Sequence, residues 1–195
     1  DISSAAFLMV AAAITPDSEL LLENVGLNPT RAGVIKALEQ MEADFELLDE
    51  REVNGEPIAD IKVKTSQLAG TTIEGDLIPL LIDEIPILAV AASQAEGKTI
   101  IKDAEELRVK ETDRIDAVVT ELTRLGVEVT EREDGLKIEG PQEIEGGVTC
   151  SSYDDHRIAM SLAVAGLIAD EEIEIEDAEC INVSFPGFKE LLMDL

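Results

Sequence analysis

The sequence is poor in aromatic residues, histidine and cysteine, and these shortages exclude several kinds of protein. It has no Trp, one Tyr, four Phe and one His among 195 residues. Its two cysteines, Cys150 and Cys180, lack metal-site spacing, so we expect free thiols in a reducing compartment and no bound metal. The core must therefore consist of Leu, Ile, Val and Ala, which suffice because 45% of the residues are apolar.

Long hydrophobic runs are also missing. The longest, residues 85–92 and 158–169, are shorter than the ~20 residues that a membrane span needs. The first four residues lack the basic segment of a signal peptide. We therefore expect a soluble, cytoplasmic protein that does not act at a membrane.

Basic residues are scarce. The 15 Lys and Arg stand against 43 Asp and Glu, which gives a formal net charge of −28. Such a surface repels nucleic acid, so we do not expect a nucleic-acid partner. The acids are spread along the chain rather than gathered in one tail. Two interpretations remain open: a salt-adapted source, or an ordinary acidic domain whose missing partner is more basic.

The chain contains three copies of one pattern, and each copy begins at an aspartate. An Ala-rich apolar helix is expected in each copy, over residues 1–14, 83–95 and 155–169. An apolar strand with an acidic end follows, over residues 19–25, 98–107 and 172–179. A second helix is expected over residues 30–41, 112–125 and 184–195. Thr30 and Thr112 are plausible N-caps of the first two of these second helices.

Copies one and two close with a predicted β-hairpin, turning at Asn54-Gly55 and at Asp134-Gly135. Copy three lacks a hairpin, so either the repeat is truncated or strands from elsewhere complete it. With a further strand leading into each copy, the pattern predicts an α/β (α+β) fold. The expected organisation is one domain, 1–195, built of three repeats at about 1–72, 73–145 and 146–195.

The first candidate motif places two acids, Asp83 and Glu84, inside a strongly apolar stretch. Burying an unpaired carboxylate costs several kcal/mol, so these acids need a reason. In one interpretation, Asp83 caps the helix that Pro86 helps to start. In the other, an acid at a helix mouth beside apolar walls is a candidate general base.

Two further motifs combine cations with helix N-termini. Lys110, Glu111 and Arg114 precede or open a helix, and they share a face if that helix begins at once. His156 and Arg157 follow Asp154 and Asp155 in the first turn of an apolar helix, where a cation is disfavoured unless an anion binds. Salt-bridged helix starts with a capping aspartate are the alternative. Without a Gly-rich phosphate loop, catalytic triad or nucleotide fingerprint, these groups favour a small anionic substrate.

Five strings together resemble the enolpyruvyl transferase family, specifically the 5-enolpyruvylshikimate-3-phosphate synthases. They are DISSAAF (1–7), LIDEIPILA (81–89), RVKETDRI (108–115), DHRIAM (155–160) and NVSFPGF (182–188). The resemblance covers nearly the whole chain. It implies a two-domain, inside-out α/β barrel of βαβαββ units, in which this chain is the C-terminal domain and the N-terminal domain is absent. In that family, strands from the beginning of the chain complete this domain.

The resemblance implies transfer of the enolpyruvyl group of phosphoenolpyruvate to shikimate 3-phosphate, in the shikimate pathway of aromatic amino acid biosynthesis, without a cofactor. Asp83 would accept or hold the 5-hydroxyl proton, and Glu111 would act as general acid and base. Lys110 would assist catalysis and contact the shikimate. Arg114 and Arg157 would bind phosphoenolpyruvate, with His156 among the substrate-binding residues.

Two positions depart from the family pattern. Val183 stands where many members carry a lysine, and Glu106 stands where some carry an asparagine. Two other functions remain as alternatives: enolpyruvyl transfer to UDP-N-acetylglucosamine, and a non-catalytic binding or folding module. The sequence leaves open whether the missing domain is separately encoded.

Overall fold

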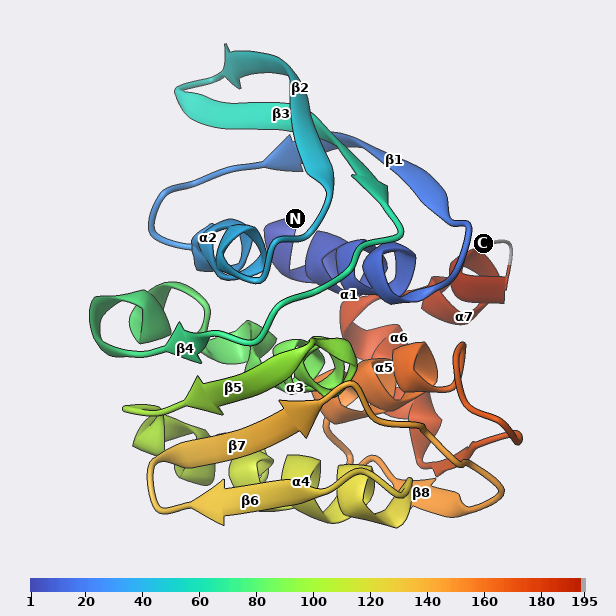
Figure 1. Ribbon diagram of the computed structural model, residues 1–195. Helices are drawn as coiled ribbons and strands as arrows, with labels where there is room; N and C mark the ends of the chain where they lie inside the picture. The colour runs from blue at the N-terminus through green and yellow to red at the C-terminus, as the bar shows by residue number, and fades with distance from the viewer. Residues whose placement is uncertain (194–195) are drawn as a thin grey trace.

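The computed structural model describes residues 1–193 of the chain (Figure 1). The helices are α1 (Ile2–Ile14), α2 (Gly33–Gln40), α3 (Ile85–Gln94), α4 (Arg114–Arg124), α5 (His156–Ala165), α6 (Ile181–Ser184) and α7 (Phe188–Met193). The strands are β1 (Glu19–Gly26), β2 (Phe45–Val53), β3 (Glu56–Lys64), β4 (Thr72–Ile73), β5 (Gly97–Ile101), β6 (Val129–Arg132), β7 (Gly135–Gly140), β8 (Thr149–Ser151) and β9 (Glu174–Glu176). Short 3₁₀ helices are η1 (Gly75–Leu80), η2 (Ile82–Glu84), η3 (Glu105–Val109) and η4 (Ala178–Cys180).

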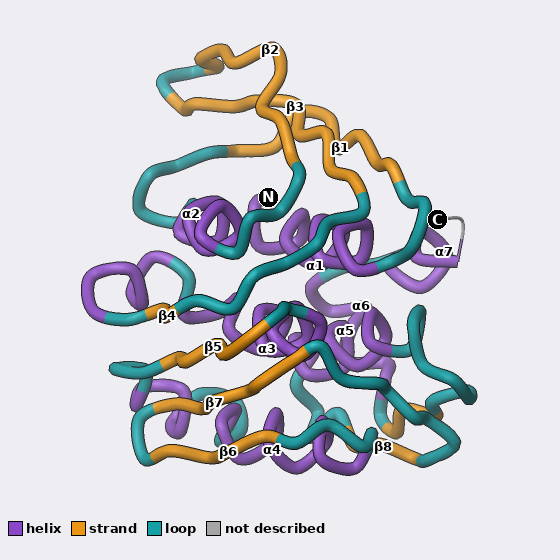
Figure 2. Tube along the Cα trace, viewed as in Figure 1, coloured by secondary structure: helices purple, strands orange, loops and turns teal. Residues whose placement is uncertain are grey.

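The strands of the described residues form three sheets, which Figure 2 shows in orange around the helices. In the first sheet, β1, β3 and β2 are antiparallel neighbours. In the second, β4 runs parallel to β5, and β7 and β6 continue antiparallel. The third holds β8 parallel to β9. The order β4-α3-β5-α4-β6-β7 is a complete βαβαββ unit, so the predicted α/β repeat fold is confirmed.

The core lies around α1, α3 and α5, which pack against one another between the sheets (Figure 1). Helix α1 is buried on nearly every face, from Ile2 to Ala13, because it carries apolar or small residues all round. Its alanines let the neighbouring helices approach closely. At the C-terminal end of the chain, Phe188 packs edge-on against Phe7, with ring centroids 6.1 Å apart, and this contact ties α7 to α1.

The sequence predicted one hairpin turn correctly and placed the other one residue too late. Val53 pairs with Glu56, so Asn54-Gly55 is the two-residue turn, as expected. Arg132 pairs with Gly135, so the second turn is Glu133-Asp134, and the prediction was wrong by one residue. A Cβ on Gly135 would lie 2.1 Å from the carbonyl oxygen of Ile101. This glycine therefore permits a close approach of β7 to the end of β5.

Neither predicted threonine cap is present. Helix α2 begins after Ala32, because Asn28 accepts hydrogen bonds from the backbone N–H (3.0 Å) and the hydroxyl (2.8 Å) of Thr30 and holds it in a turn. The N-cap of α4 is Asp113 rather than Thr112. Its carboxylate accepts from the Asp116 N–H at 3.1 Å and also pairs with Arg108 at 3.0 Å.

Two predicted strands and several predicted helices are shorter than expected. Helix α5, for example, ends at Ala165 rather than at 169. Strands β5 and β9 end at Ile101 and Glu176, and Asp103 and Asp177, which follow them, adopt positive φ values of 60° and 54° that interrupt the extended backbone. Helix α7 begins at Phe188 rather than at 184, and residues 194–195 of the prediction lie outside the described residues. Between residues 1 and 193, no helix has the length and apolar character needed to cross a membrane.

Candidate active site

The N-terminal ends of α1, α3, α4 and α5 lie close together. A cavity of about 210 Å³ is lined by the first residues of α1 and α5, together with Ser184 and Phe185. Arg157 at the start of α5 reaches Asp83 and Glu84, which precede α3. Arg114 at the start of α4 reaches Asp155, which precedes α5. Because the first N–H groups of each helix lack intrahelical partners, this end of the molecule favours anions.

Seven ionised side chains interlock here, and we call them the charged cluster. Its members are the cations Lys110, Arg114 and Arg157 and the carboxylates Asp83, Glu84, Glu111 and Asp155. The cluster draws on the segments before α3, α4 and α5, so the three-copy pattern of the chain brings it together. Carboxylates outnumber cations by one within it, so as it stands the cluster neutralises its own positive charge.

Arg114 is the centre of the charged cluster and is only 1% exposed. Its Nε donates to Asp155 at 2.7 Å, its Nη1 to Asp83 at 3.0 Å and its Nη2 to Glu111 at 2.7 Å. Burial alone would lower the pKa of Arg114, but the hydrogen bond and charge of Asp155, with the charges of Glu111 and Asp83, raise it. A ligand can reach this guanidinium only where Glu111 or Asp83 gives way.

Asp83 is surrounded by three cations. Its carboxylate lies 3.0 Å from Arg114 Nη1, 3.4 Å from Lys110 Nζ and 3.8 Å from Arg157 Nη2. Partial burial raises the pKa of Asp83, but the charges of Arg157, Lys110 and Arg114 outweigh it, so the net pKa is below the ordinary value. Asp83 is therefore ionised at neutral pH. It does not cap α3, whose N-cap is Glu84 without a side-chain bond, so the capping interpretation was wrong.

Arg157 explains why Glu84 is buried. Its Nη1 donates to the Asp83 carbonyl at 3.0 Å and to Glu84 Oε1 at 3.2 Å. Glu84 is 3% exposed, and a buried carboxylate needs such a partner. The backbone N–H of Arg157 donates to Asp155 at 2.8 Å, so Asp155 caps α5 as one interpretation expected. The side chain of Arg157 is 13% exposed, which leaves one edge open to a ligand.

Lys110 and Glu111 lie on a short segment between η3 and α4. Helix α4 begins only at Arg114, so Lys110 and Arg114 do not share a helix face, contrary to the expectation for an immediate helix start. They meet at Asp83 instead. The Glu111 side chain is 55% exposed, so a ligand can reach its carboxylate.

His156 lies beside the charged cluster and lines the 210 Å³ cavity. Burial and then the charge of Arg157 lower its pKa below the ordinary value, against the opposing effect of Asp155. The imidazole is thus neutral at neutral pH. It can serve a ligand as a hydrogen-bonding group but not as a fixed positive charge.

The structure brings all six predicted site residues together, and their chemical roles remain predictions. Sequence reasoning missed Arg108, which fastens the segment before α4 to the β6–β7 turn. Its guanidinium donates to the Glu133 carbonyl at 2.8 Å, to Asp113 at 3.0 Å and to Glu131 at 2.9 Å. An arginine two residues before the motif lysine was the available signal. Among residues 1–193, no group of three or more His, Cys, Asp or Glu side chains is arranged to hold a metal ion.

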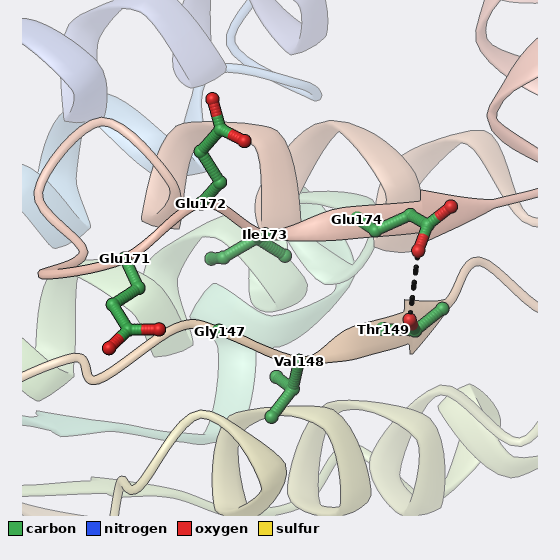
Figure 3. Close-up of a pocket in the computed structure, with 7 residues that line it drawn as sticks. All are labelled: Gly147, Val148, Thr149, Glu171, Glu172, Ile173 and Glu174. Carbon is green, nitrogen blue, oxygen red and sulfur yellow. Dashed lines mark hydrogen bonds between the residues drawn. The ribbon is translucent and has the colours of Figure 1, made fainter.

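A larger hollow lies elsewhere, along β8 and β9, and has a volume of about 760 Å³ (Figure 3). It is lined by Gly147–Thr149, Ile173 and three glutamates, Glu171, Glu172 and Glu174. Glu174 accepts a hydrogen bond from the Thr149 hydroxyl at 3.0 Å. An open acidic groove of this kind repels anions and contains none of the predicted site residues, so it is not the candidate active site.

Known proteins resemble the chain over its whole length. The sequence profile of EPSP synthase (3-phosphoshikimate 1-carboxyvinyltransferase) matches residues 1–192. The 3-phosphoshikimate 1-carboxyvinyltransferase of Petrotoga mobilis is 59% identical over 191 residues, which are 98% of this chain and 44% of that protein. Its counterpart from Synechococcus elongatus is 58% identical over 195 residues, or 100% and 43%.

Solved structures of enolpyruvyl transferases also resemble the chain. The EPSP synthase of Acinetobacter baumannii superimposes with a TM-score of 0.96 at 48% identity, covering 100% of this chain and 45% of that one. The enolpyruvyl transferase NikO of Streptomyces tendae has a TM-score of 0.78 at 18% identity, which shows a shared fold. The chain spans a little under half the length of these relatives.

Proposed function

The chain belongs to the EPSP synthase (3-phosphoshikimate 1-carboxyvinyltransferase) family, and we propose that, together with the portion of the enzyme that it does not span, it transfers the enolpyruvyl group of phosphoenolpyruvate to the 5-hydroxyl of shikimate 3-phosphate. Phosphate leaves, and the reaction passes through a tetrahedral intermediate. The observation that carries the proposal is the charged cluster, which offers proton-exchanging carboxylates and anion-binding cations within direct contact of one another.

Ligand binding would activate Asp83 by removing its cations. The carboxylate and phosphate of phosphoenolpyruvate compete with Asp83 for Arg157 and Arg114, which are the groups that now hold its pKa down. As those cations turn to the ligand, the pKa of Asp83 rises and the carboxylate becomes a better base. Asp83 then accepts or holds the proton of the 5-hydroxyl, while Lys110 remains beside the Asp83 carboxylate.

Glu111 would supply and recover the proton at the methylene carbon of phosphoenolpyruvate. In the free chain, its Oε2 is bound to Arg114 Nη2 at 2.7 Å. A ligand carboxylate that takes this nitrogen displaces Glu111 from its cation. Glu111 then lies next to the bound phosphoenolpyruvate, where the reaction needs a general acid.

The rest of the enzyme is a proposed partner that supplies further positive charge. The charged cluster has one carboxylate more than it has cations, yet both proposed substrates are multiply charged anions. We therefore expect the chain alone to bind them weakly and to lack turnover, as a non-catalytic module would. We also propose a cytoplasmic location, because the free thiols of Cys150 and Cys180 suit a reducing compartment.

Reconstitution tests the function. The chain is joined to the remaining portion of the Petrotoga mobilis relative, and release of phosphate is measured with phosphoenolpyruvate and shikimate 3-phosphate. Turnover should require both portions and both substrates.

Two controls test the alternative acceptor and the need for the partner portion. UDP-N-acetylglucosamine in place of shikimate 3-phosphate should give no product, and a product there would identify the sister activity instead. Robust turnover by the chain alone would contradict the expected need for a partner portion.

A further inference from the structure

Glu121 is a buried carboxylate that lies outside the charged cluster. It is 1% exposed and belongs to α4. It follows Arg114 by seven residues, two helical turns, so the two side chains leave α4 on the same face. Arg114 contacts Asp155, and Glu121 contacts residues 151 and 153. Helix α4 is thus fastened at two points to the segment 151–155, which leads into α5.

Each oxygen of Glu121 has a defined role in this attachment. Its Oε1 accepts from the Tyr153 hydroxyl at 2.9 Å, and its Oε2 accepts from the Ser151 backbone N–H at 3.2 Å. Arg124 Nε lies 3.5 Å from Oε2, while its Nη1 donates to the Thr149 carbonyl at 2.9 Å. A buried carboxylate with these partners holds the end of β8 and the following turn against α4.

The turn that Glu121 holds is in a conformation that its residues rarely adopt. Tyr153 and Asp154 have φ values of +55° and +56°, in the left-handed region. Such residues persist where the surroundings fix them. Here the hydroxyls of Ser151 and Ser152 accept from the Tyr153 and Asp154 N–H groups, each at 3.1 Å. With the phenol anchored on Glu121, the turn delivers Asp155 to its buried position beside Arg114.

We propose that Glu121 is a positioning residue for the transferase site: by fixing the turn 151–155 on α4, it sets the distance between Arg114 and Arg157. Arg114 opens α4, and Arg157 follows the turn at the start of α5. Asp155 touches both, through the Arg114 side chain at 2.7 Å and the Arg157 N–H at 2.8 Å. If the turn moves, the two proposed anion-binding groups separate. The predicted effect on catalysis rests on the proposed function, whereas the attachment of the turn 151–155 to α4 by Glu121 does not.

The attachment can be tested on the chain alone. Tyr153 is the single tyrosine of a sequence without tryptophan, so tyrosine fluorescence reports this residue and no other. A hydrogen-bonded carboxylate quenches phenol emission, so Glu121→Ala should raise the emission. Glu39→Gln, on the exposed face of α2, is the control and should leave it unchanged. Amide hydrogen exchange across residues 151–157 should also accelerate in Glu121→Ala. Unchanged exchange there would overturn the proposal whether or not the reconstituted enzyme is active.

The catalytic consequence is tested in the reconstituted enzyme. Glu121→Ala should raise KM for phosphoenolpyruvate by about tenfold or more, because small displacements of binding groups are costly. KM for shikimate 3-phosphate should change much less. Glu121→Gln keeps one of the two acceptor oxygens, so it can still accept from Tyr153 or from Ser151 and should restore part of the affinity.

A purely structural role gives a different pattern. If Glu121→Ala lowers the thermal midpoint but leaves KM for phosphoenolpyruvate unchanged in the folded enzyme, Glu121 does not position the site. A KM that is as high in Glu121→Gln as in Glu121→Ala would also contradict the proposal. If the unsubstituted enzyme shows no transferase activity, the proposed function fails, and the exchange measurement still decides whether Glu121 holds the turn.

Discussion

At the scale of single residues, Arg114 joins the fold to the site. It neutralises Asp155, which is fully buried and has no exposure to water. Arg114→Ala would leave that carboxylate uncompensated, so we expect a loss of about 3–5 kcal/mol in the free energy of unfolding. Urea unfolding of the chain measures it. Lys110→Ala, which removes a more exposed partner of Asp83, is the control and should cost about 1 kcal/mol or less. Equal losses for both variants would contradict the central role of Arg114.

Glu111 should affect turnover rather than stability, because its side chain is half exposed and has one cationic neighbour. Glu111→Gln keeps the shape and removes the exchangeable proton. Turnover of the reconstituted enzyme should fall by about 10²–10⁴-fold. Binding of shikimate 3-phosphate should barely change, because that ligand does not need the proton. Steady-state kinetics and binding titrations check both, and near-normal turnover would show that the assigned role is wrong.

Asp83 should make stability depend on pH in acid. Its folded pKa is lower than the unfolded value of about 3.9, so its ionised form stabilises the fold above that pH. The contribution is lost as pH falls below about 4 and through the folded pKa. Asp83→Asn should therefore be less stable than the unsubstituted chain at pH 6, and the gap should shrink as the pH approaches 2. Denaturant unfolding across this range measures the gap, and a constant gap would exclude the ion pairs as its cause.

At the scale of helices and strands, the sequence predicted the elements better than their ends. Apolar, Ala-rich composition located α1, α3 and α5, because helices that are buried on nearly every face are apolar along their whole length. The predictions of Thr30 and Thr112 as N-caps were wrong because the neighbouring Asn28 and Asp113 side chains accept the backbone hydrogen bonds instead. Residue propensities alone do not show which of several nearby acceptors the folded backbone will meet. The site motifs were found because ionised groups at helix starts conflict with ordinary preferences. Glu121 left no such signal, since a glutamate on a helix is unremarkable until its burial is known.

The third sheet is the least complete element of the described residues. Strand β5 has neighbours on both sides, β4 and β7, whereas β9 is paired with β8 alone. In the first two copies, the hairpin following the second helix supplies the extra strands, and copy three has none up to residue 193. The remaining portion of the enzyme should complete this sheet, close to the acidic hollow of Figure 3.

Hydrogen exchange checks that expectation. Amides of β9 should exchange faster than those of β5 in the chain alone, because a strand with one neighbour opens more easily. Adding the remaining portion should slow exchange in β9 and leave β5 nearly unchanged, so β5 serves as the internal control. Protection of β9 that is already equal to that of β5 would contradict an incomplete sheet.

At the scale of the whole molecule, the net charge of −28 dominates. Most of the 43 acidic residues have no cation to pair with, because the chain contains only 15. Strand β2 and the groove along β8 and β9 carry many of these acids. Repulsion among them opposes the compact state, since unfolding increases their separation. Within the charged cluster, the carboxylates are paired with cations, so they contribute little to this repulsion.

Salt should therefore stabilise the chain. The Debye length is about 30 Å at 0.01 M salt and about 3 Å at 1 M, so repulsion across the surface is long-ranged in dilute buffer and screened at high salt. The thermal midpoint should rise clearly between these conditions. A variant with Glu42, Glu50 and Glu52 replaced by Gln removes three exposed negative charges and separates screening from a general effect of salt on apolar burial. Its midpoint should be higher than that of the unsubstituted chain at 0.01 M, and the difference should nearly vanish at 1 M. A midpoint that is flat or falls with salt, or a difference that persists at 1 M, would show that charge repulsion does not limit the stability of this fold.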